Sequence, residues 1–187
     1  SIWGIYLNGG GDNKVANSVF NNINHTNIGY SYGIQAISSD NNTIDNNTIS
    51  SIGAQIGSAG ILITNSIGGN ITFNNLDTLS SSGIEITASA DGNFIMHNTI
   101  SNFDGVGVKL ISDNNLCNNN TLSSGNIAVW LLQDYNNITN NTLTGNTRGV
   151  ELYYYTNFNQ VINNTIIGST LYGIHLETTS NYNNIIN

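Results

Sequence analysis

The sequence predicts an all-β solenoid in which short strands stack in successive coils. Three observations support this prediction. A motif of Gly or Ala followed by apolar-x-apolar returns eight times along the 187 residues. The apolar residues in and after each copy alternate with polar ones, which is the period of a strand with one buried side. Proline, whose missing N–H would interrupt a hydrogen-bonded ladder, is absent.

The recurring motif forms the first strand of each coil. Its copies are GIYL (4–7), GIQA (33–36), GILI (60–63), GIEI (83–86), GVKL (107–110), AVWL (128–131), GVEL (149–152) and GIHL (173–176). The copies start 29, 27, 23, 24, 21, 21 and 24 residues apart. We therefore expect about eight coils of 21–29 residues, with insertions at the turns, which a solenoid tolerates. The first-strand core positions are Ile5, Ile34, Ile61, Ile84, Val108, Val129, Val150 and Ile174.

Two further short strands follow each motif, as in NNITNNTL (136–143) and NTIDNNTI (42–49). The second strand is expected to bury Val15, Ile44, Ile71, Ile95, Cys117, Ile138, Val161 and Ile185. The third is expected to bury Phe20, Ile49, Leu76, Ile100, Leu122, Leu143 and Ile166. Because stacked strands lie about 4.8 Å apart, equivalent residues of successive coils should contact one another.

An asparagine ladder is predicted at the turn between the second and third strands. Its members are Ser18, Asn47, Asn74, Asn98, Asn120, Asn141 and Asn164. Asparagine tolerates the left-handed backbone conformation that a tight turn needs, and its amide can bond to the amide of the next coil. We therefore interpret the Asn-rich composition as part of an ordered fold.

These coils resemble the right-handed, single-stranded parallel β-helix. In particular, they resemble the β-helix repeat family shared by carbohydrate-binding and sugar-hydrolase proteins and by a periplasmic copper-maturation factor. The resemblance covers essentially the whole chain and implies one β-helix domain, residues 1–187. No cap is visible at either end, so we expect a segment of a longer protein or subunits that associate end to end, because solenoids need caps for solubility.

Composition argues against several partners. Only 7% of the residues are charged, the net charge is −8, and the chain has three basic residues, too few to neutralise a nucleic-acid backbone. The chain contains no run of 18 apolar residues, so no membrane-spanning segment is predicted. The single cysteine, Cys117, excludes an internal disulfide framework.

The outward positions of the first strand concentrate the chemistry of the chain. They read Tyr6, Gln35, Leu62, Glu85, Lys109, Trp130, Glu151 and His175. The resemblance implies that this face contacts polysaccharides, and aromatic rings with a few polar groups suit a sugar chain. The candidate glycan-binding residues are Trp130, Glu85, Lys109, Tyr153 and Glu177.

A catalytic set is also conceivable on this face. Glu151 and His175 occupy adjacent coils, with Arg148 close by. A carboxylate beside a histidine can perform acid–base chemistry, and an arginine can stabilise an enolate or a uronate. Hydrolysis would instead need two carboxylates, for which Glu151 and Glu177 are candidates. The alternative is a partly exposed face with ordinary charged cross-strand pairs.

Other patterns give weaker candidates. The chain contains N-x-S/T sequons, of which Asn24, Asn41 and Asn137 are the glycosylation candidates, although the turns alone explain such triplets. Asp91, Asp113 and Asp134 could hold Ca²⁺, but we favour a role in their own turns. The spacing of the three histidines predicts no metal site, and we expect no cofactor.

The leading functional hypothesis is an extracellular or cell-surface module with a structural or adhesive role that contacts a polysaccharide or surface glycan. One alternative is a polysaccharide-processing enzyme, namely a lyase, epimerase or hydrolase. A second is a self-assembling filament subunit. Nucleic acid is not an expected partner.

Overall fold

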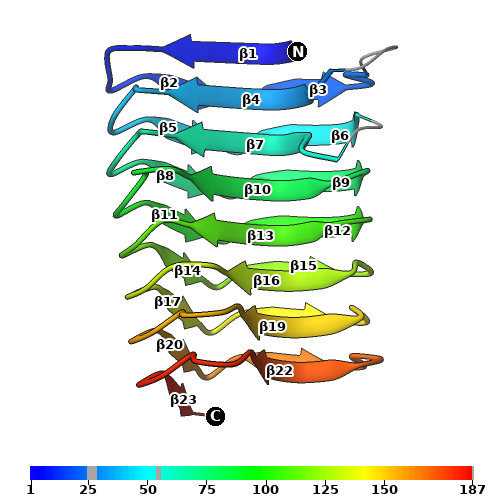
Figure 1. The fold of residues 1–187 in the computed structure, drawn as a ribbon. Helices are drawn as coiled ribbons and strands as arrows, with labels where there is room; N and C mark the ends of the chain where they lie inside the picture. Colours follow the sequence, from blue (N-terminus) through cyan, green and yellow to red (C-terminus); the bar gives the residue numbers. More distant parts are fainter. Residues whose placement is uncertain (25–28, 54–55, 187) are drawn as a thin grey trace.

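The computed structural model describes residues 1–24, 29–53 and 56–186, and within these ranges the chain forms 23 β-strands and no α-helix. Figure 1 shows the coils stacked one upon another, with the N-terminus in the first coil and the C-terminus in the last. Strands of successive coils pair in parallel to give three sheets. The parallel β-helix predicted from the sequence is therefore confirmed.

The first sheet contains eight strands: β1 (Ile2–Asn8), β4 (Ser31–Ile37), β7 (Ala59–Thr64), β10 (Ser82–Thr87), β13 (Val106–Ile111), β16 (Ile127–Leu131), β19 (Arg148–Leu152) and β22 (Tyr172–Leu176). The second also contains eight: β2 (Lys14–Ala16), β5 (Thr43–Asp45), β8 (Asn70–Thr72), β11 (Phe94–Met96), β14 (Leu116–Asn118), β17 (Asn137–Thr139), β20 (Gln160–Ile162) and β23 (Asn184–Ile186). The third contains seven: β3 (Val19–Asn21), β6 (Thr48–Ile52), β9 (Asn75–Leu79), β12 (Thr99–Phe103), β15 (Thr121–Ser123), β18 (Thr142–Thr144) and β21 (Thr165–Ile167).

The number of full turns is slightly smaller than the eight coils expected. In the described part of the chain, six coils, from β4–β6 to β19–β21, have all three strands and a neighbouring coil on both sides. The first coil has a neighbour on one side, and the last has no strand in the third sheet. Repeat counting from the motif alone does not distinguish complete from partial turns.

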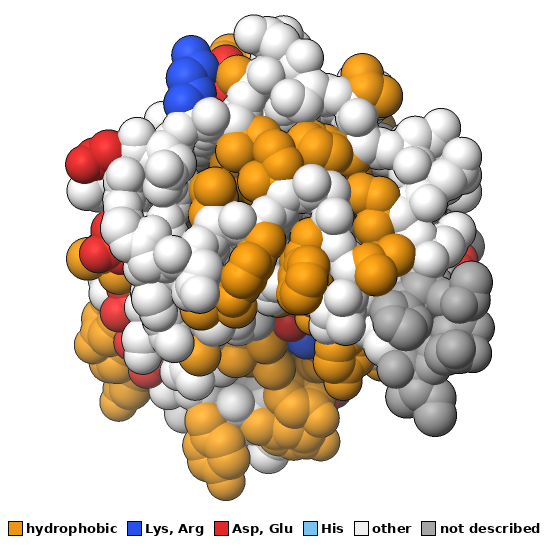
Figure 2. All heavy atoms as spheres, turned by 90° about the horizontal axis from the view of Figure 1, so that it is seen from above, with side chains coloured by type: hydrophobic (Ala, Val, Ile, Leu, Met, Phe, Trp, Pro, Cys, Tyr) orange, Lys and Arg blue, Asp and Glu red, His pale blue; other side chains and the backbone are white. Residues whose placement is uncertain are grey.

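The register confirms the three predicted core columns. Ile84 pairs with Ile61 on one side and with Val108 on the other, and all three are fully buried. The members in the outermost coils are less covered: Ile5 and Ile174 are half-buried, and Ile185 is exposed. Figure 2 shows apolar side chains in the middle of the end face at the β1 end of the stack.

The glycine of the recurring motif lies where two coils approach most closely. A Cβ atom on Gly83 would lie 2.5 Å from the carbonyl oxygen of Gly107 and 2.7 Å from Cγ2 of Ile100. Ala128 occupies the same column and is fully buried. The column therefore accepts only the smallest residues, because overpacking displaces the backbone of the neighbouring coil.

The asparagine ladder is confirmed at the turn between the second and third sheets. Oδ1 of Asn98 accepts hydrogen bonds from the backbone N–H (2.9 Å) and from Nδ2 (3.0 Å) of Asn74. The same backbone bond repeats from Ser18 to Asn164. Each buried amide thus satisfies a turn N–H that the sheets leave without a partner.

The expected backbone role of these asparagines is wrong. The left-handed residue is the one before each ladder member, as at Asn46 (φ 51°), Phe73 (φ 53°) and His97 (φ 58°). Phe73 and His97 occupy this conformation although they are bulky, and their rings stack with centroids 4.9 Å apart. The ladder asparagine is selected by hydrogen bonding, and the residue before it by the turn.

A second ladder, which the sequence reading missed, runs along the turn between the first and second sheets. Oδ1 of Asn115 accepts from the backbone N–H of Asn93 at 2.9 Å, and Asn136 accepts in the same way from Asn115. Its members are Asn42, Asn93, Asn115, Asn136, Asn159 and Asn183. Two polar ladders therefore flank the second sheet and fix the register of every coil.

Within the described chain, no helix is long and apolar enough to cross a bilayer.

Candidate functional site

The outward column of the first sheet is confirmed by the strand register. Tyr6, Gln35, Leu62, Glu85, Lys109, Trp130, Glu151 and His175 pair in that order across the eight strands. Side chains on one face of a parallel sheet stack at the strand spacing. The column is thus a continuous strip of polar and aromatic side chains, with Leu62 as its one aliphatic member.

The middle of the strip is a chain of contacts between predicted glycan-binding residues. Nζ of Lys109 lies 3.2 Å from Oε1 of Glu85 and 5.5 Å from the ring centroid of Trp130. The ring of Trp130 meets that of Tyr153 edge-on, with centroids 5.4 Å apart. The lysine therefore bridges a carboxylate and an aromatic face, an arrangement stabilised by the quadrupole of the indole.

Glu151 on β19 is the buried acid of the face. Only 4% of its surface is exposed. Its Oε2 accepts a hydrogen bond at 3.0 Å from Nη1 of Arg148, which lies three residues earlier on the same strand. A buried carboxylate is costly unless it is paired, and Arg148 is the partner of Glu151 at this position.

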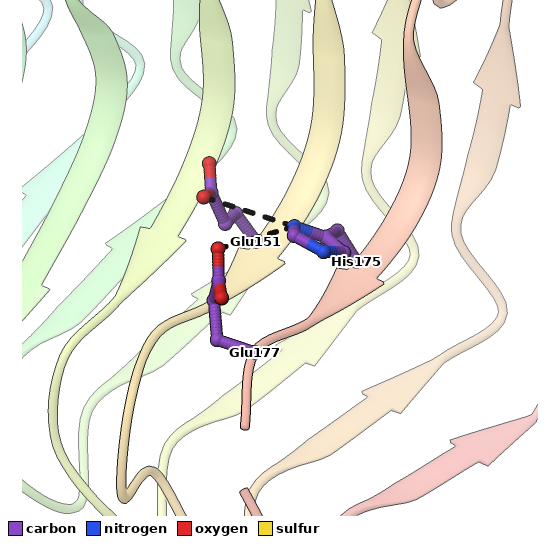
Figure 3. Close-up of side chains that lie close together, drawn as sticks. All are labelled: Glu151, His175 and Glu177. Atoms are coloured by element: carbon purple, nitrogen blue, oxygen red, sulfur yellow. Dashed lines mark ion pairs between the residues drawn. The ribbon is translucent and has the colours of Figure 1, made fainter. Parts of the chain in front are cut away.

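His175 on β22 lies between two carboxylates. Its Nδ1 is 3.9 Å from Oε1 of Glu151 and 3.7 Å from Oε1 of Glu177, and Figure 3 shows the three side chains converging. The imidazole stacks on Tyr172 with centroids 4.5 Å apart. This stacking fixes the plane of the ring and therefore the direction of its two nitrogens.

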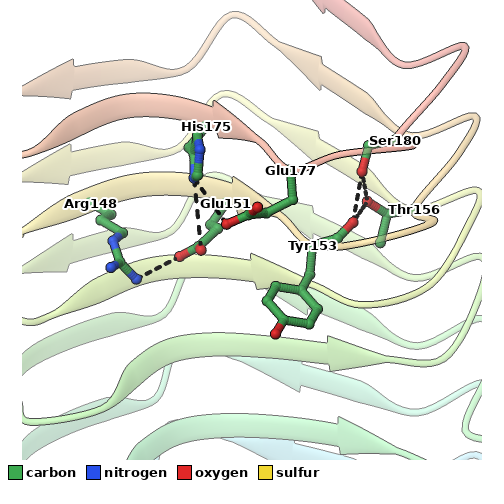
Figure 4. A network of polar contacts seen from close by, with 7 residues as sticks. All are labelled: Arg148, Glu151, Tyr153, Thr156, His175, Glu177 and Ser180. Carbon is green, nitrogen blue, oxygen red and sulfur yellow. Dashed lines mark hydrogen bonds and ion pairs between the residues drawn. The ribbon is translucent and has the colours of Figure 1, made fainter.

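The turn after β19 forms an aromatic border of this cluster. Thr156 Oγ1 and Ser180 Oγ both donate to the carbonyl oxygen of Tyr153, at 2.6 and 2.7 Å, and Figure 4 shows this pair beside the Arg148–Glu151–His175 group. The negative charge of Glu177 is the main reason why the pKa of Tyr154 is raised. The border is therefore held in place by its own turn and by the turn of the following coil.

Unpartnered polar atoms gather at this cluster. Among the described residues, five buried side-chain nitrogen or oxygen atoms lack a hydrogen-bond partner, and three of them are Trp130 Nε1, Arg148 Nε and His175 Nδ1. All three belong to adjacent strands of the first sheet. Native proteins leave few buried polar groups unsatisfied, and such groups call for an explanation. These three nitrogens are therefore the buried donors or acceptors of this face that have an unused hydrogen-bonding capacity.

The structure brings together every residue proposed for catalysis and for glycan binding on this face. Tyr172 and Tyr154 are additions that the sequence reading missed. Tyr172 pairs in register with Arg148, so aligning the repeats would have placed Tyr172 beside the proposed catalytic residues. The catalytic and glycan-binding roles themselves remain predictions.

The three glycosylation candidates differ in exposure. Asn24 and Asn41 are exposed, and the other two residues of the Asn24 sequon lie outside the described residues. Asn137 on β17 is half-buried, and its Oδ1 is among the buried atoms without a partner. Glycosylation therefore stays a prediction, with exposed Asn24 and Asn41 as the accessible acceptors.

The predicted aspartate column has a different role from the one expected. Oδ1 of Asp91 accepts from the backbone N–H of Asp113 at 3.0 Å, and Oδ1 of Asp113 accepts from that of Asp134 at 2.9 Å. The expectation that each aspartate caps its own turn is wrong, because each bonds the turn of the following coil. Calcium binding at Asp91, Asp113 and Asp134 remains a possibility raised by the sequence alone.

Two cavities lie away from the Glu151 cluster. One, of about 480 Å³, is lined by residues near the C-terminal ends of third-sheet strands, including Ser51, Thr78 and Asn102. The other, of about 500 Å³, lies beside the aspartate column and includes Asp91 and Asp113. The Glu151 cluster instead occupies the strip along the first sheet, which suits an extended ligand better than a small enclosed one.

The chain is similar to known β-helix proteins over its whole length. Residues 3–187 match the family described as "Right handed beta helix region". A mutant of the periplasmic alginate epimerase AlgG superposes with a TM-score of 0.71 at 18% identity, covering 98% of this chain and 47% of that one. The A-module of the Azotobacter vinelandii mannuronan C-5 epimerase AlgE4 gives a TM-score of 0.52 at 12% identity, with coverage of 94% and 58%.

These two likenesses show the fold, because both identities are low. The chain spans about half the length of the two proteins, 47% and 58% respectively. The sequence has no significant match among curated proteins.

Proposed function

Since this chain belongs to the right-handed β-helix family, we propose that it is the polysaccharide-contacting part of a polysaccharide-processing enzyme. The observation that carries the proposal is the convergence on Glu151 of Arg148, His175 and Glu177, with buried unpartnered nitrogens around them. The two epimerase structures support a role on polysaccharides. They favour the enzyme alternative over an adhesive module.

The cluster contains the groups that proton transfer at a uronic acid requires. His175 can take or give a proton at the carbon next to the sugar carboxylate, because an imidazole changes charge near neutral pH. The guanidinium of Arg148 and the indole N–H of Trp130 can donate to the carboxylate as its negative charge grows. After His175 has removed the proton, epimerisation requires that a proton from solvent reach the opposite face of the same carbon, whereas lysis expels the leaving oxygen from the neighbouring carbon.

Glu151 is better suited to position Arg148 than to touch the sugar. Its side chain is only 6% exposed, compared with 23% for Glu177 and 29% for His175. If Glu151 lost its charge, the guanidinium of Arg148 would lose the bond that orients it. Glu177 is the carboxylate that a bound sugar can reach.

The experiment is incubation of the chain with uronic-acid polysaccharides in deuterated water, with neutral polysaccharides as the comparison. Deuterium at carbon 5 reports epimerisation, ultraviolet absorbance of an unsaturated end reports lysis, and saturated new ends report hydrolysis. His175→Gln should lower the rate by about 100-fold or more if the imidazole transfers the proton. Exposed His97, on the turn after the second sheet, provides the matched control His97→Asn.

The proposal fails if no product forms on any polysaccharide, or if His175→Gln and Arg148→Ala process the substrate as fast as the unmodified chain. Arg148→Lys separates charge from geometry, because lysine retains the charge but cannot present the planar fork of arginine.

The second candidate function is a glycan-binding module without turnover. The observation favouring it is the aromatic run Trp130, Tyr153 and Tyr154, whose neighbouring centroids are 5.4 and 4.7 Å apart. Trp130→Ala should then abolish retention of the polysaccharide while no new ends appear. A location outside the cytoplasm, extracellular or periplasmic, accompanies both candidates, since one structural neighbour is described as periplasmic.

A further inference from the structure

We infer that Glu151, His175 and Glu177 form a binding site for one divalent transition-metal ion, with Zn²⁺ as the test ion. One donor atom from each residue lies within 4.8 Å of the others. Figure 3 shows that the donors come from β19, β22 and the residue following β22, and that they face one another. The inference goes beyond the proposed polysaccharide activity and stands without it.

The distances are close to those of a metal-bound set. The separations of 3.9 Å from His175 Nδ1 to Glu151 and 3.7 Å to Glu177 are too long for hydrogen bonds. Zinc binds imidazole nitrogen and carboxylate oxygen at about 2.0–2.2 Å, which places tetrahedral neighbours about 3.3–3.6 Å apart. A rotation of the half-buried Glu177 side chain can adjust its own distance to His175, and the Glu151–His175 pair has to close by a few tenths of an ångström.

The donors are also prepared for an ion individually. Nδ1 of His175 is buried and has no hydrogen-bond partner, and the stack on Tyr172 holds its ring plane. Glu151 is nearly fully buried, and Arg148 bonds its Oε2, so Oε1 is the oxygen directed at His175. A buried imidazole nitrogen aimed between two carboxylates is the arrangement of a mixed nitrogen–oxygen metal site.

The type of donor selects the type of ion. Calcium and magnesium take oxygen ligands, whereas an imidazole nitrogen favours zinc and its neighbours in the first transition row. Three protein ligands leave at least one position for water or for a ligand oxygen. Two carboxylates against the one guanidinium of Arg148 leave a local charge of about −1, which a divalent ion reverses and so makes compatible with an anionic ligand.

The competing interpretation is a protonated His175 held between the two carboxylates. It explains the same distances without an ion. The two interpretations differ in whether the chain binds zinc at these residues, and binding can be measured without any polysaccharide.

The test is calorimetric titration of the chelator-treated 187-residue chain with zinc chloride, with calcium chloride as the comparison. We expect one zinc ion per chain, the same affinity in His97→Asn, and no comparable binding of calcium. His175→Gln and Glu177→Gln should each bind zinc at least about 10-fold more weakly. The visible absorption of the cobalt-loaded chain, lost in His175→Gln, provides a readout that reports nitrogen ligation directly.

Absence of zinc binding by the unmodified chain, or undiminished binding by both variants, would overturn the inference in favour of the protonated histidine. Failure of the polysaccharide assay would not affect the titration. Conversely, polysaccharide processing that persists in chelator would leave the metal site to be judged on binding alone.

Discussion

The side-chain oxygen of Asn120 accepts two hydrogen bonds from Asn98 in the preceding coil, one from its backbone N–H at 2.9 Å and one from its Nδ2 at 3.0 Å. Nδ2 of Asn120 in turn donates to the carbonyl oxygen of Ile95 at 2.8 Å. One amide therefore serves a side chain and two backbone groups, in a position that is 1% exposed.

Replacement of Asn120 by alanine should destabilise the fold by about 2–4 kcal/mol, because it leaves a buried N–H and a buried carbonyl without partners. The measurement is urea unfolding followed by circular dichroism. Neighbouring Asn119 is exposed, has φ 54° and provides the control Asn119→Gly, which should change stability by about 0.5 kcal/mol or less. Equal losses in both variants would show that the ladder amide has no special role.

The glycine column gives a second prediction. Gly83→Ala should cost about 1–3 kcal/mol, because the added methyl group meets the backbone of the next coil at 2.5 Å. Gly173→Ala adds the same methyl group at a position where, among the described residues that are not its chain neighbours, the nearest atom is Cγ2 of Ile166 at 4.0 Å, and should be tolerated. Thermal unfolding of the two variants compares them directly, and a tolerated Gly83→Ala would mean that the coils can separate to admit a methyl group.

Asp77 predicts a pH dependence. Hydrogen bonds from Ser101, and to a lesser degree from Asn102 and Thr78, hold the pKa of Asp77 below its ordinary value of 3.8. A carboxyl whose pKa is lower in the folded state contributes stability above the unfolded pKa, and this stability is lost as the pH falls through the folded pKa.

The stability difference between the unmodified chain and Asp77→Asn should therefore be constant above about pH 5 and shrink at lower pH. Denaturant titrations at several pH values measure it. A difference that grows on acidification would contradict the assigned direction of the shift.

Cys117 predicts a protected thiol. Its burial in the second-sheet core column raises the pKa of the thiol to about 12, so very little thiolate exists at mildly alkaline pH. Iodoacetamide should leave the folded chain unmodified and label it readily in urea, as mass spectrometry would show. Rapid labelling without denaturant would indicate that the β14 strand opens frequently.

The core columns could be read from the sequence because the period of two leaves little freedom. Once Ile84 is assigned inward, Glu85 must face outward, and the repeat carries this assignment to Lys109 and Trp130. The glycine before Ile84 was recognised as part of the motif, but its steric role follows only from the approach of the next backbone.

Other features depend on turn geometry, which the repeat pattern does not specify. Nothing in the local sequence shows that Phe73 and His97 occupy the left-handed conformation and stack on each other. Glu177 follows its strand, and its approach to His175 is set by the turn that Thr156 and Ser180 hold. The cluster of Glu151, His175 and Glu177 was missed as a candidate metal site because only the spacing between the three histidines was considered. The side chains that approach His175 are glutamates from two coils.

The two polar ladders have a consequence for how such a protein can change over time. Each asparagine rung, such as Asn98, interacts with the coil before it and the coil after it, and offers the same donor and acceptor as the other asparagine rungs. A coil that is duplicated or lost between equivalent asparagines would join its new neighbours without any other substitution. The strip along the first sheet could thereby be lengthened or shortened in whole-coil steps, so genetic duplication alone would alter the length of the surface that it presents.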